Sequence, residues 1–265
     1  MTKKVVDLYE YFNIPKLEGA RAEITTYLKE DNLEKPTVLI IPGGAYTHIG
    51  ERETEPVALK YYENGYNVLV LRYSLVPLGY PTQLIEGCLA VAYAKETLNK
   101  EVIVVGFSAG GHLAFSVATL NEEKVVKEVL GERDCKPNGV ILGYPVIISD
   151  EDYVSDSIKG ISKGDKEIIE LLSLEKRVTK DTPPTFIWTT ADDRGVPSEN
   201  SLKLALELRK NKVNFELHVF EHGMHGLALA TIETASKGLE DKMCLSDVAK
   251  WFDLSVDFIR RNFNK

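Results

Sequence analysis

A serine flanked by glycines follows a short apolar run near the middle of the chain. The segment Val105-Gly106-Phe107-Ser108-Ala109-Gly110 contains the pattern G-x-S-x-G. Valine and isoleucine precede it at 102–105, and small and apolar residues that suit a helix follow it at 113–118. A serine on such a strand-to-helix turn projects its hydroxyl above the sheet, where the free N–H groups of the helix N-terminus also point. The pattern therefore predicts Ser108 as a nucleophile beside an anion site.

A serine hydroxyl needs a general base to act as a nucleophile. The segment 221–226 reads Glu-His-Gly-Met-His-Gly and offers two histidines, His222 and His225. His225 is favoured as the base because it lies in a loop among small residues and is free to reach inward, whereas His222 is expected to pack or bond locally. His112, four residues beyond Ser108, is expected to make a structural hydrogen bond beneath the site.

The base in turn needs a carboxylate that orients the imidazole and stabilises its protonated form. Asp192 and Asp193 follow the apolar stretch 185–189, and Arg194 comes directly after them. Because the two aspartates are adjacent, spacing alone does not choose between them. The one that is not used is expected to cap a turn or to pair with Arg194.

Acyl transfer also needs backbone donors for the oxyanion. Pro42-Gly43-Gly44-Ala45 follows the apolar stretch 36–41, and its glycines allow N–H groups to approach a tetrahedral oxyanion. The N–H of Ala109, directly after the nucleophile, is the expected second donor. The resulting chain order of oxyanion loop, serine, aspartate and histidine is that of α/β hydrolases and not that of chymotrypsin or subtilisin.

Buried apolar stretches alternate with helical patterns along the chain, which predicts an α/β fold with a mostly parallel central sheet and helices on both faces. Active sites of such sheets lie at the carboxyl ends of the strands. We expect a single domain over 1–265, with 146–182 as a lid or cap insertion or else a plain surface excursion. Strands are expected at 22–28, 36–41, 66–71, 102–105, 139–144, 185–189 and 214–220, and helices at 53–62, 81–98, 166–174, 198–210 and 246–262.

Composition narrows the class of partner. The chain has 265 residues, a formal net charge of −8 and a pI of about 5.3, which argues against nucleic acid and anionic membranes as main partners. No apolar run is long enough for a membrane span, and no signal peptide is apparent. Three scattered cysteines fit a reducing cytoplasm. A small-molecule ester is the expected partner, and a homo-oligomer is left open.

Taken together, these segments resemble the α/β-hydrolase superfamily over nearly the whole chain, and more narrowly the small acetylesterases and acetyl-xylan-esterase-like lipases. The resemblance implies Ser108 as nucleophile, His225 as base and Asp192 as acid, because peptidase relatives with a similar aspartate pair use the first aspartate. The related hormone-sensitive-lipase group has His-Gly-Gly-Gly in its oxyanion loop. The loop here departs from that pattern, so the donor is one of Gly43, Gly44 and Ala45, with Gly44 as first choice.

The resemblance implies a serine carboxylesterase that cleaves short acyl esters, acetyl in particular, on a carbohydrate or another alcohol. The expected mechanism is a two-step acyl transfer that requires no metal and no cofactor. Tyr46 and Tyr73 are candidates for a sugar-facing pocket, with core packing as the alternative. A small-peptide peptidase, a lipase for longer acyl chains and a non-catalytic binding module are the other functions to weigh.

Overall fold

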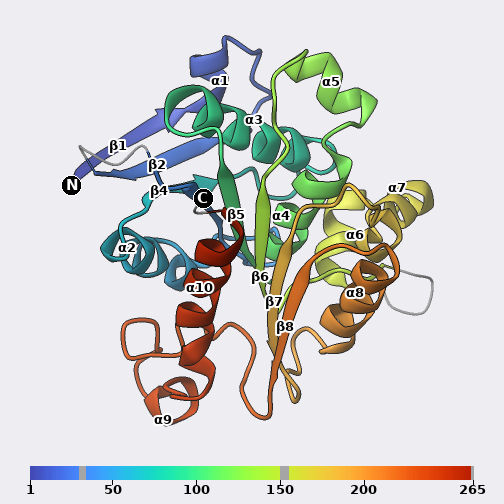
Figure 1. Ribbon diagram of the computed structural model, residues 1–265. Coiled ribbons are helices and arrows are strands. Elements are labelled where there is room, and N and C mark those ends of the chain that lie inside the picture. The colour runs from blue at the N-terminus through green and yellow to red at the C-terminus, as the bar shows by residue number, and fades with distance from the viewer. Residues whose placement is uncertain (30–33, 150–154, 264–265) are drawn as a thin grey trace.

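The computed structural model describes residues 1–29, 34–149 and 155–263, and an eight-stranded sheet forms its centre (Figure 1). The strands lie in the order β1-β2-β4-β3-β5-β6-β7-β8. Their bounds are β1 Thr2–Asp7, β2 Glu23–Leu28, β3 Thr37–Ile41, β4 Asn67–Arg72, β5 Val102–Phe107, β6 Gly139–Gly143, β7 Thr185–Thr190 and β8 Phe215–Phe220. All seven predicted strands are therefore present.

The six strands from β4 to β8 in this order are mutually parallel, while β1 and β2 join antiparallel at one edge. The central strands are buried on both faces, which explains their continuous apolar sequences. The expectation of a mostly parallel sheet is correct. Strand β1 was not expected, because as an edge strand it is largely exposed and lacks a buried apolar run.

Helices cover both faces of the sheet (Figure 1). One core contains buried side chains of α1, α3, α4, α5, α6 and α8, and the other contains those of α2, α9 and α10. The bounds are α1 Leu8–Phe12, α2 Glu55–Glu63, α3 Thr82–Thr97, α4 Ala109–Leu120, α5 Lys124–Leu130, α6 Asp156–Ser162, α7 Lys166–Leu171, α8 Glu199–Lys210, α9 Glu240–Met243 and α10 Trp251–Phe263. The last helix begins later than expected because a short 3-10 turn, Val248–Lys250, precedes it.

The segment 146–182 contains α6 and α7, and its described part is tied to the body of the protein. The Tyr80 N–H donates to the carbonyl of Ile161 in α6, at 2.9 Å. Near the start of the segment, the N–H groups of Ile147 and Ile148 both donate to Oδ1 of Asn200, at 2.9 and 3.0 Å. Residues 150–154 lie outside the described residues, so the role of this segment as a lid stays a prediction.

The predicted functional segments follow strands β3, β5, β7 and β8, and the parallel arrangement brings those strand ends to one edge of the sheet. This edge is where open α/β sheets place their ligands. Within the described ranges, none of the helices combines the length and the apolar character needed to cross a bilayer.

Candidate active site

Ser108 lies on a strained turn between β5 and α4. Its backbone has φ 53° and ψ −122°, a conformation that is costly for a residue with a side chain. Glycine is required on both sides of it: a Cβ on Gly106 would lie 2.4 Å from the carbonyl oxygen of Gly110, and a Cβ on Gly110 would lie 2.2 Å from that of Ile41. The turn is therefore the nucleophile elbow that the G-x-S-x-G pattern predicts.

Two hydrogen bonds connect this serine to a carboxylate. Ser108 Oγ lies 2.8 Å from His225 Nε2, and His225 Nδ1 lies 2.8 Å from Asp193 Oδ2. Ser108 is 9% exposed, and the Asp193 side chain is 1% exposed. Because a carboxylate only accepts, His225 carries its proton on Nδ1, which leaves Nε2 free to accept the serine proton.

The expectation that Asp192 orients the histidine is wrong in this structure. Asp192 Oδ1 accepts from the N–H of Gly223 at 2.7 Å, and its Oδ2 lies 3.2 Å from His222 Nδ1. The Gly223 hydrogen bond lowers the pKa of Asp192, whose side chain is 54% exposed. The turn after β7 directs this side chain outward and that of Asp193 inward, where it meets His225.

A sequence signal for the correct aspartate exists. Asp193 Oδ1 accepts from the N–H groups of Gly195 and Val196, at 2.8 and 3.0 Å, which is an Asx-type turn. A Cβ on Gly195 would lie 2.7 Å from that of His225. In Asp193-Arg194-Gly195, the aspartate therefore closes the turn, and the glycine two residues later allows the loop of His225 to approach closely.

His112 has the structural role that was expected. Its Nε2 lies 3.1 Å from the Leu172 carbonyl, which can only accept, so Nε2 carries the proton. The hydroxyl of Tyr46 lies 2.9 Å from Nδ1 and donates to it. Burial lowers the pKa of His112 to about 4, which keeps the ring neutral in this role.

The sugar-facing role expected of Tyr46 and Tyr73 is not what the structure shows. Both side chains are buried, at 1% exposure each, and their rings contact each other edge to face. The Tyr73 hydroxyl donates to the carbonyl of Pro42 at 2.7 Å. Tyr73 therefore holds the loop that follows β3, Tyr46 of that loop packs against it, and the alternative of core packing is the correct one.

The loop after β3 packs directly against the nucleophile. A Cβ on Gly43 would lie 2.9 Å from that of Ser108, and a Cβ on Gly44, at φ +120°, would lie 2.0 Å from the carbonyl oxygen of His48. The N–H of Gly43 already donates to a carboxylate, Glu53 Oε2, at 2.6 Å. In the described part of the chain, the N–H groups of Gly44, Ala45 and Ala109 have no acceptor, so these three remain the candidate oxyanion donors.

Glu53 is a residue that the sequence analysis missed. Its carboxylate is 4% exposed and also accepts from the Tyr144 hydroxyl, at 2.7 Å. Burial raises the pKa of Glu53, while the hydrogen bonds from Tyr144 and Gly43 lower it. Nothing in the local pattern Glu51-Arg52-Glu53 marks the third residue as buried, because charged residues in such a turn are ordinarily solvated.

A hollow of about 790 Å³ opens beside His225, on the side of the loops that follow β7 and β8. Its volume is in the range of small-molecule sites. Two cations, Arg194 and Lys242, lie in its wall without a carboxylate partner among the described residues. The lining comprises Asp192, Arg194, Gly195, His222, Gly223, Met224, His225, Lys242 and Leu245.

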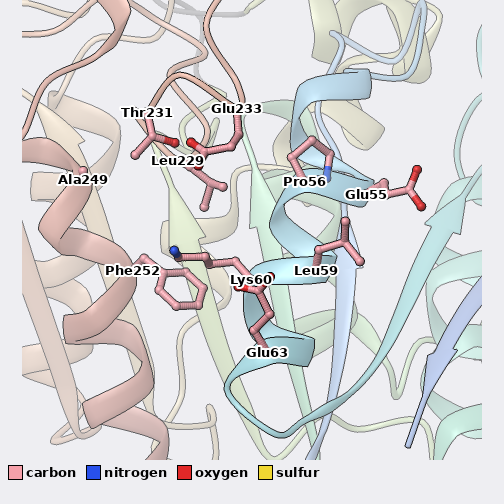
Figure 2. A pocket seen from close by; sticks show the side chains of 10 residues that line it. All are labelled: Glu55, Pro56, Leu59, Lys60, Glu63, Leu229, Thr231, Glu233, Ala249 and Phe252. Atoms are coloured by element: carbon pink, nitrogen blue, oxygen red, sulfur yellow. The ribbon is translucent and has the colours of Figure 1, made fainter. Parts of the chain in front are cut away.

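A second hollow, of about 420 Å³, lies between α2 and α10 (Figure 2). Leu59 and Lys60 project into it from α2, and Phe252 faces them from α10. Neither Ser108 nor His225 lines it. This hollow is therefore separate from the nucleophile and its base.

Comparison with known proteins identifies a family and several related hydrolases. Residues 24–208 match the family model described as BD-FAE. The endo-1,4-beta-xylanase B of Butyrivibrio fibrisolvens is 34% identical over 237 residues, which are 84% of this chain and 37% of that protein. The acetylxylan esterase of Xylanibacter ruminicola is 26% identical over 83% of this chain and 46% of its own length. The chain thus spans less than half the length of these curated relatives.

Solved structures match over nearly the full chain. An acetyl ester-xyloside bifunctional hydrolase from Caldicellulosiruptor lactoaceticus has a TM-score of 0.81 at 33% identity and covers 97% of this chain and 96% of its own. A carboxylesterase from Lactobacillus plantarum has a TM-score of 0.83 at 26% identity, with 98% of both chains covered. An α/β hydrolase from a deep-sea metagenome has a TM-score of 0.78 at 34% identity, covering 100% and 99%. The predicted α/β-hydrolase fold is confirmed.

Proposed function

Because the chain belongs to the BD-FAE family of α/β hydrolases, we propose that it is a serine esterase that cleaves short acyl esters, acetyl esters of carbohydrates among them. The observation that supports this most directly is the pair of 2.8 Å hydrogen bonds that join Ser108, His225 and Asp193. The prediction of an enzyme that hydrolyses esters agrees with the esterases among its relatives.

In the first half of the proposed reaction, Ser108 Oγ attacks the ester carbonyl while His225 Nε2 takes its proton. Asp193 holds the ring in the tautomer that can accept and stabilises the imidazolium that forms. The N–H groups of Gly44 and Ala109 are the proposed donors to the oxyanion. Gly43 is no longer a candidate because its N–H donates to Glu53, and Ala45 stays the alternative to Gly44.

His225 then gives its proton to the leaving alcohol, so the alcohol part of the substrate must lie beside this histidine. We assign that part to the 790 Å³ hollow, which His225 lines and Ser108 does not. Arg194, His222 and Lys242 in its wall can hydrogen-bond to the hydroxyl groups of a sugar. Water then attacks the acyl-enzyme with the same groups in the same roles, and the acid is released.

Carbohydrate esters are proposed on the strength of the relatives, whose names refer to xylan or xyloside. Acetylated xylo-oligosaccharides are therefore the first natural-type substrates to measure. A cytoplasmic location stays a prediction that rests on the sparse, scattered cysteines.

The test is a series of p-nitrophenyl acetate, butyrate and octanoate with the wild type and with Ser108→Ala. We expect kcat/KM to fall steeply with chain length and to be lost in the variant. A preference for octanoate would replace the proposal with a lipase, and activity on peptide amides above that on esters would replace it with a peptidase. No activity on any ester, with ligand still bound, would favour a binding module.

A further inference from the structure

A buried carboxylate, Glu53, lies behind the proposed reaction centre and belongs to none of its expected parts. It ends the 3-10 turn Glu51–Glu53, ten residues beyond Gly43, and it is 4% exposed. One oxygen accepts from the N–H of Gly43 at 2.6 Å, and the other accepts from the hydroxyl of Tyr144 at 2.7 Å. The first of these contacts ties the carboxylate to the proposed oxyanion loop.

The second contact leads to the histidine. The Tyr144 hydroxyl also accepts from the N–H of Ala228 at 2.9 Å, three residues beyond His225. The Tyr144 ring lies edge to face with the His225 imidazole, with 5.0 Å between centroids. Glu53 thus connects the loop that holds the proposed oxyanion donors with the loop that holds the base, through one tyrosine.

The directions of these hydrogen bonds favour an ionised Glu53. The N–H groups of Gly43 and Ala228 can only donate, so the Tyr144 oxygen accepts from Ala228 and its own proton points to Glu53. Both oxygens of Glu53 therefore act as acceptors. An ionised carboxylate has two good acceptor oxygens, whereas a protonated one has only one. A carboxylic acid would present its O–H oxygen to one of these two donors and would accept a weaker hydrogen bond there.

The groups that face Glu53 come from several elements. Tyr144 and Tyr73 are uncharged, Arg52 is a cation, and His225 becomes one when it takes the serine proton. Burial is the largest influence and raises the pKa of Glu53, whereas the positive charges of Arg52 and of protonated His225 lower it. Arg52 reaches away to the carbonyl of Gly226 and to Ser236 Oγ, at 3.3 and 2.8 Å. The coupling between Glu53 and His225 is reciprocal, so an ionised Glu53 stabilises a protonated His225.

We propose that Glu53 is a positioning residue of the esterase reaction: its carboxylate holds the oxyanion loop through Gly43 and holds the His225 loop through Tyr144, while its charge stabilises the imidazolium. The proposal rests on the proposed function, since it assigns Glu53 to the reaction of Ser108. Other residues contact the substrate and the reacting atoms, and Glu53 acts on the reaction through Gly43 and Tyr144.

The test compares Glu53→Gln with Glu86→Gln by kcat, KM and the pH profile of p-nitrophenyl acetate hydrolysis. Glu86 is the matched control because it is an equally buried glutamate that accepts from the Ser74 N–H and the Tyr9 hydroxyl, away from Ser108. Glu53→Gln is expected to lower kcat by about tenfold or more and to change KM by less than about threefold. The acidic limb of kcat/KM should move by about 0.5 unit to lower pH, because the imidazolium loses a stabilising charge.

A merely structural role would lower the melting temperature of Glu53→Gln without moving the acidic limb. Unchanged kcat in Glu53→Gln, or the same loss and the same shift in Glu86→Gln, would overturn the proposal. If Glu53→Gln fails to fold, Tyr144→Phe decides, since it keeps the carboxylate and removes the connection to the His225 loop. Reduced kcat with KM retained is then expected, and unchanged kcat would overturn the proposal.

Failure of the underlying reaction would be visible separately. If Ser108→Ala kept its activity, the reaction to which Glu53 is assigned would not exist, whatever Glu53→Gln did. If Ser108→Ala is inactive and Glu53→Gln is unaffected, the esterase reaction stands and only the role of Glu53 falls.

Discussion

Asp193 accepts a hydrogen bond from His225 at 2.8 Å, although Asp192, one residue earlier, has the more exposed and chemically identical carboxylate. The choice is made by the turn after β7, which buries one side chain and directs the other to solvent. Asp193 is additionally fixed by the N–H groups of Gly195 and Val196. A pre-oriented acceptor of this kind is what the base requires.

The first prediction separates the two aspartates. Asp193→Asn should lower kcat by about 10³-fold or more, because an amide at this position no longer holds the His225 tautomer that accepts the serine proton. Asp192→Asn should change kcat by less than about threefold, since the side-chain hydrogen bonds of Asp192 go to Gly223 and His222 and not to His225. Steady-state hydrolysis of p-nitrophenyl acetate measures both. Equal losses in the two variants, or a larger loss in Asp192→Asn, would contradict the assignment.

The site was predictable from sequence to the extent that its chemistry depends on residue type and chain order. Ser108, His225 and the glycine loop follow strand ends that apolar runs reveal. The identity of the acid depends on which way a turn directs two adjacent side chains, and the resemblance to peptidases pointed to the wrong one. The burial of Glu53 depends on a tertiary contact with Gly43 that no local pattern contains.

A second prediction concerns the nucleophile elbow. Gly110→Ala should destabilise the protein by about 3 kcal/mol, because its Cβ would lie 2.2 and 2.3 Å from the carbonyl oxygens of Ile41 and Pro42. Gly160→Ala, inside α6, is the control because its Cβ would lie near a single side-chain atom, Val76 Cγ1 at 3.2 Å, and no backbone atom of another element within 4 Å. It should be neutral or more stable by up to about 1 kcal/mol. Urea unfolding measures both, and equal stabilities would count against the close packing of the elbow.

A third prediction follows from the neutral, buried His112. Its pKa is lowered from 6.5 to about 4, so the unfolded chain binds a proton between these values that the folded protein does not. The contribution of His112 to the free energy of unfolding is fully present above pH 6.5. It falls by about 3 kcal/mol in total as the pH is lowered through 4. In His112→Gln this part of the pH dependence should be absent. Urea unfolding at pH 7 and pH 4.5 checks this, and parallel losses in both proteins would contradict it.

A fourth prediction tests where the alcohol part of the substrate binds. Leu245→Trp narrows the hollow beside His225 and should raise KM for an acetylated xylo-oligosaccharide by about tenfold or more, at a cost of more than about 1.4 kcal/mol of binding. The smaller p-nitrophenyl acetate should be affected less. Leu59→Trp narrows the hollow between α2 and α10 and is the matched control, with no change expected. If only Leu59→Trp raised KM, the sugar would bind in the hollow between α2 and α10, and the assignment to the hollow beside His225 would be wrong.

The fold was predictable where strands are buried on both faces, as for Val38–Ile41 and Val102–Val105, because their apolar runs are continuous. The last helix was also expected, and Phe252, Ile259 and Phe263 form part of its buried side. Strand β1 escaped prediction because pairing with β2, and not burial, holds it. Short helices such as α5 and α9 have too few residues for a periodic signal.

The central claim is that the acyl group is carried by Ser108. Its most direct test is peptide mass spectrometry of the wild type and Ser108→Ala, acid-quenched during hydrolysis of p-nitrophenyl acetate. The account predicts an acetyl group on the wild-type peptide that contains Ser108, and neither this acetyl group nor hydrolysis in the variant. Hydrolysis that persists in Ser108→Ala, with no acetyl group on the Ser108 peptide of the wild type, would contradict it.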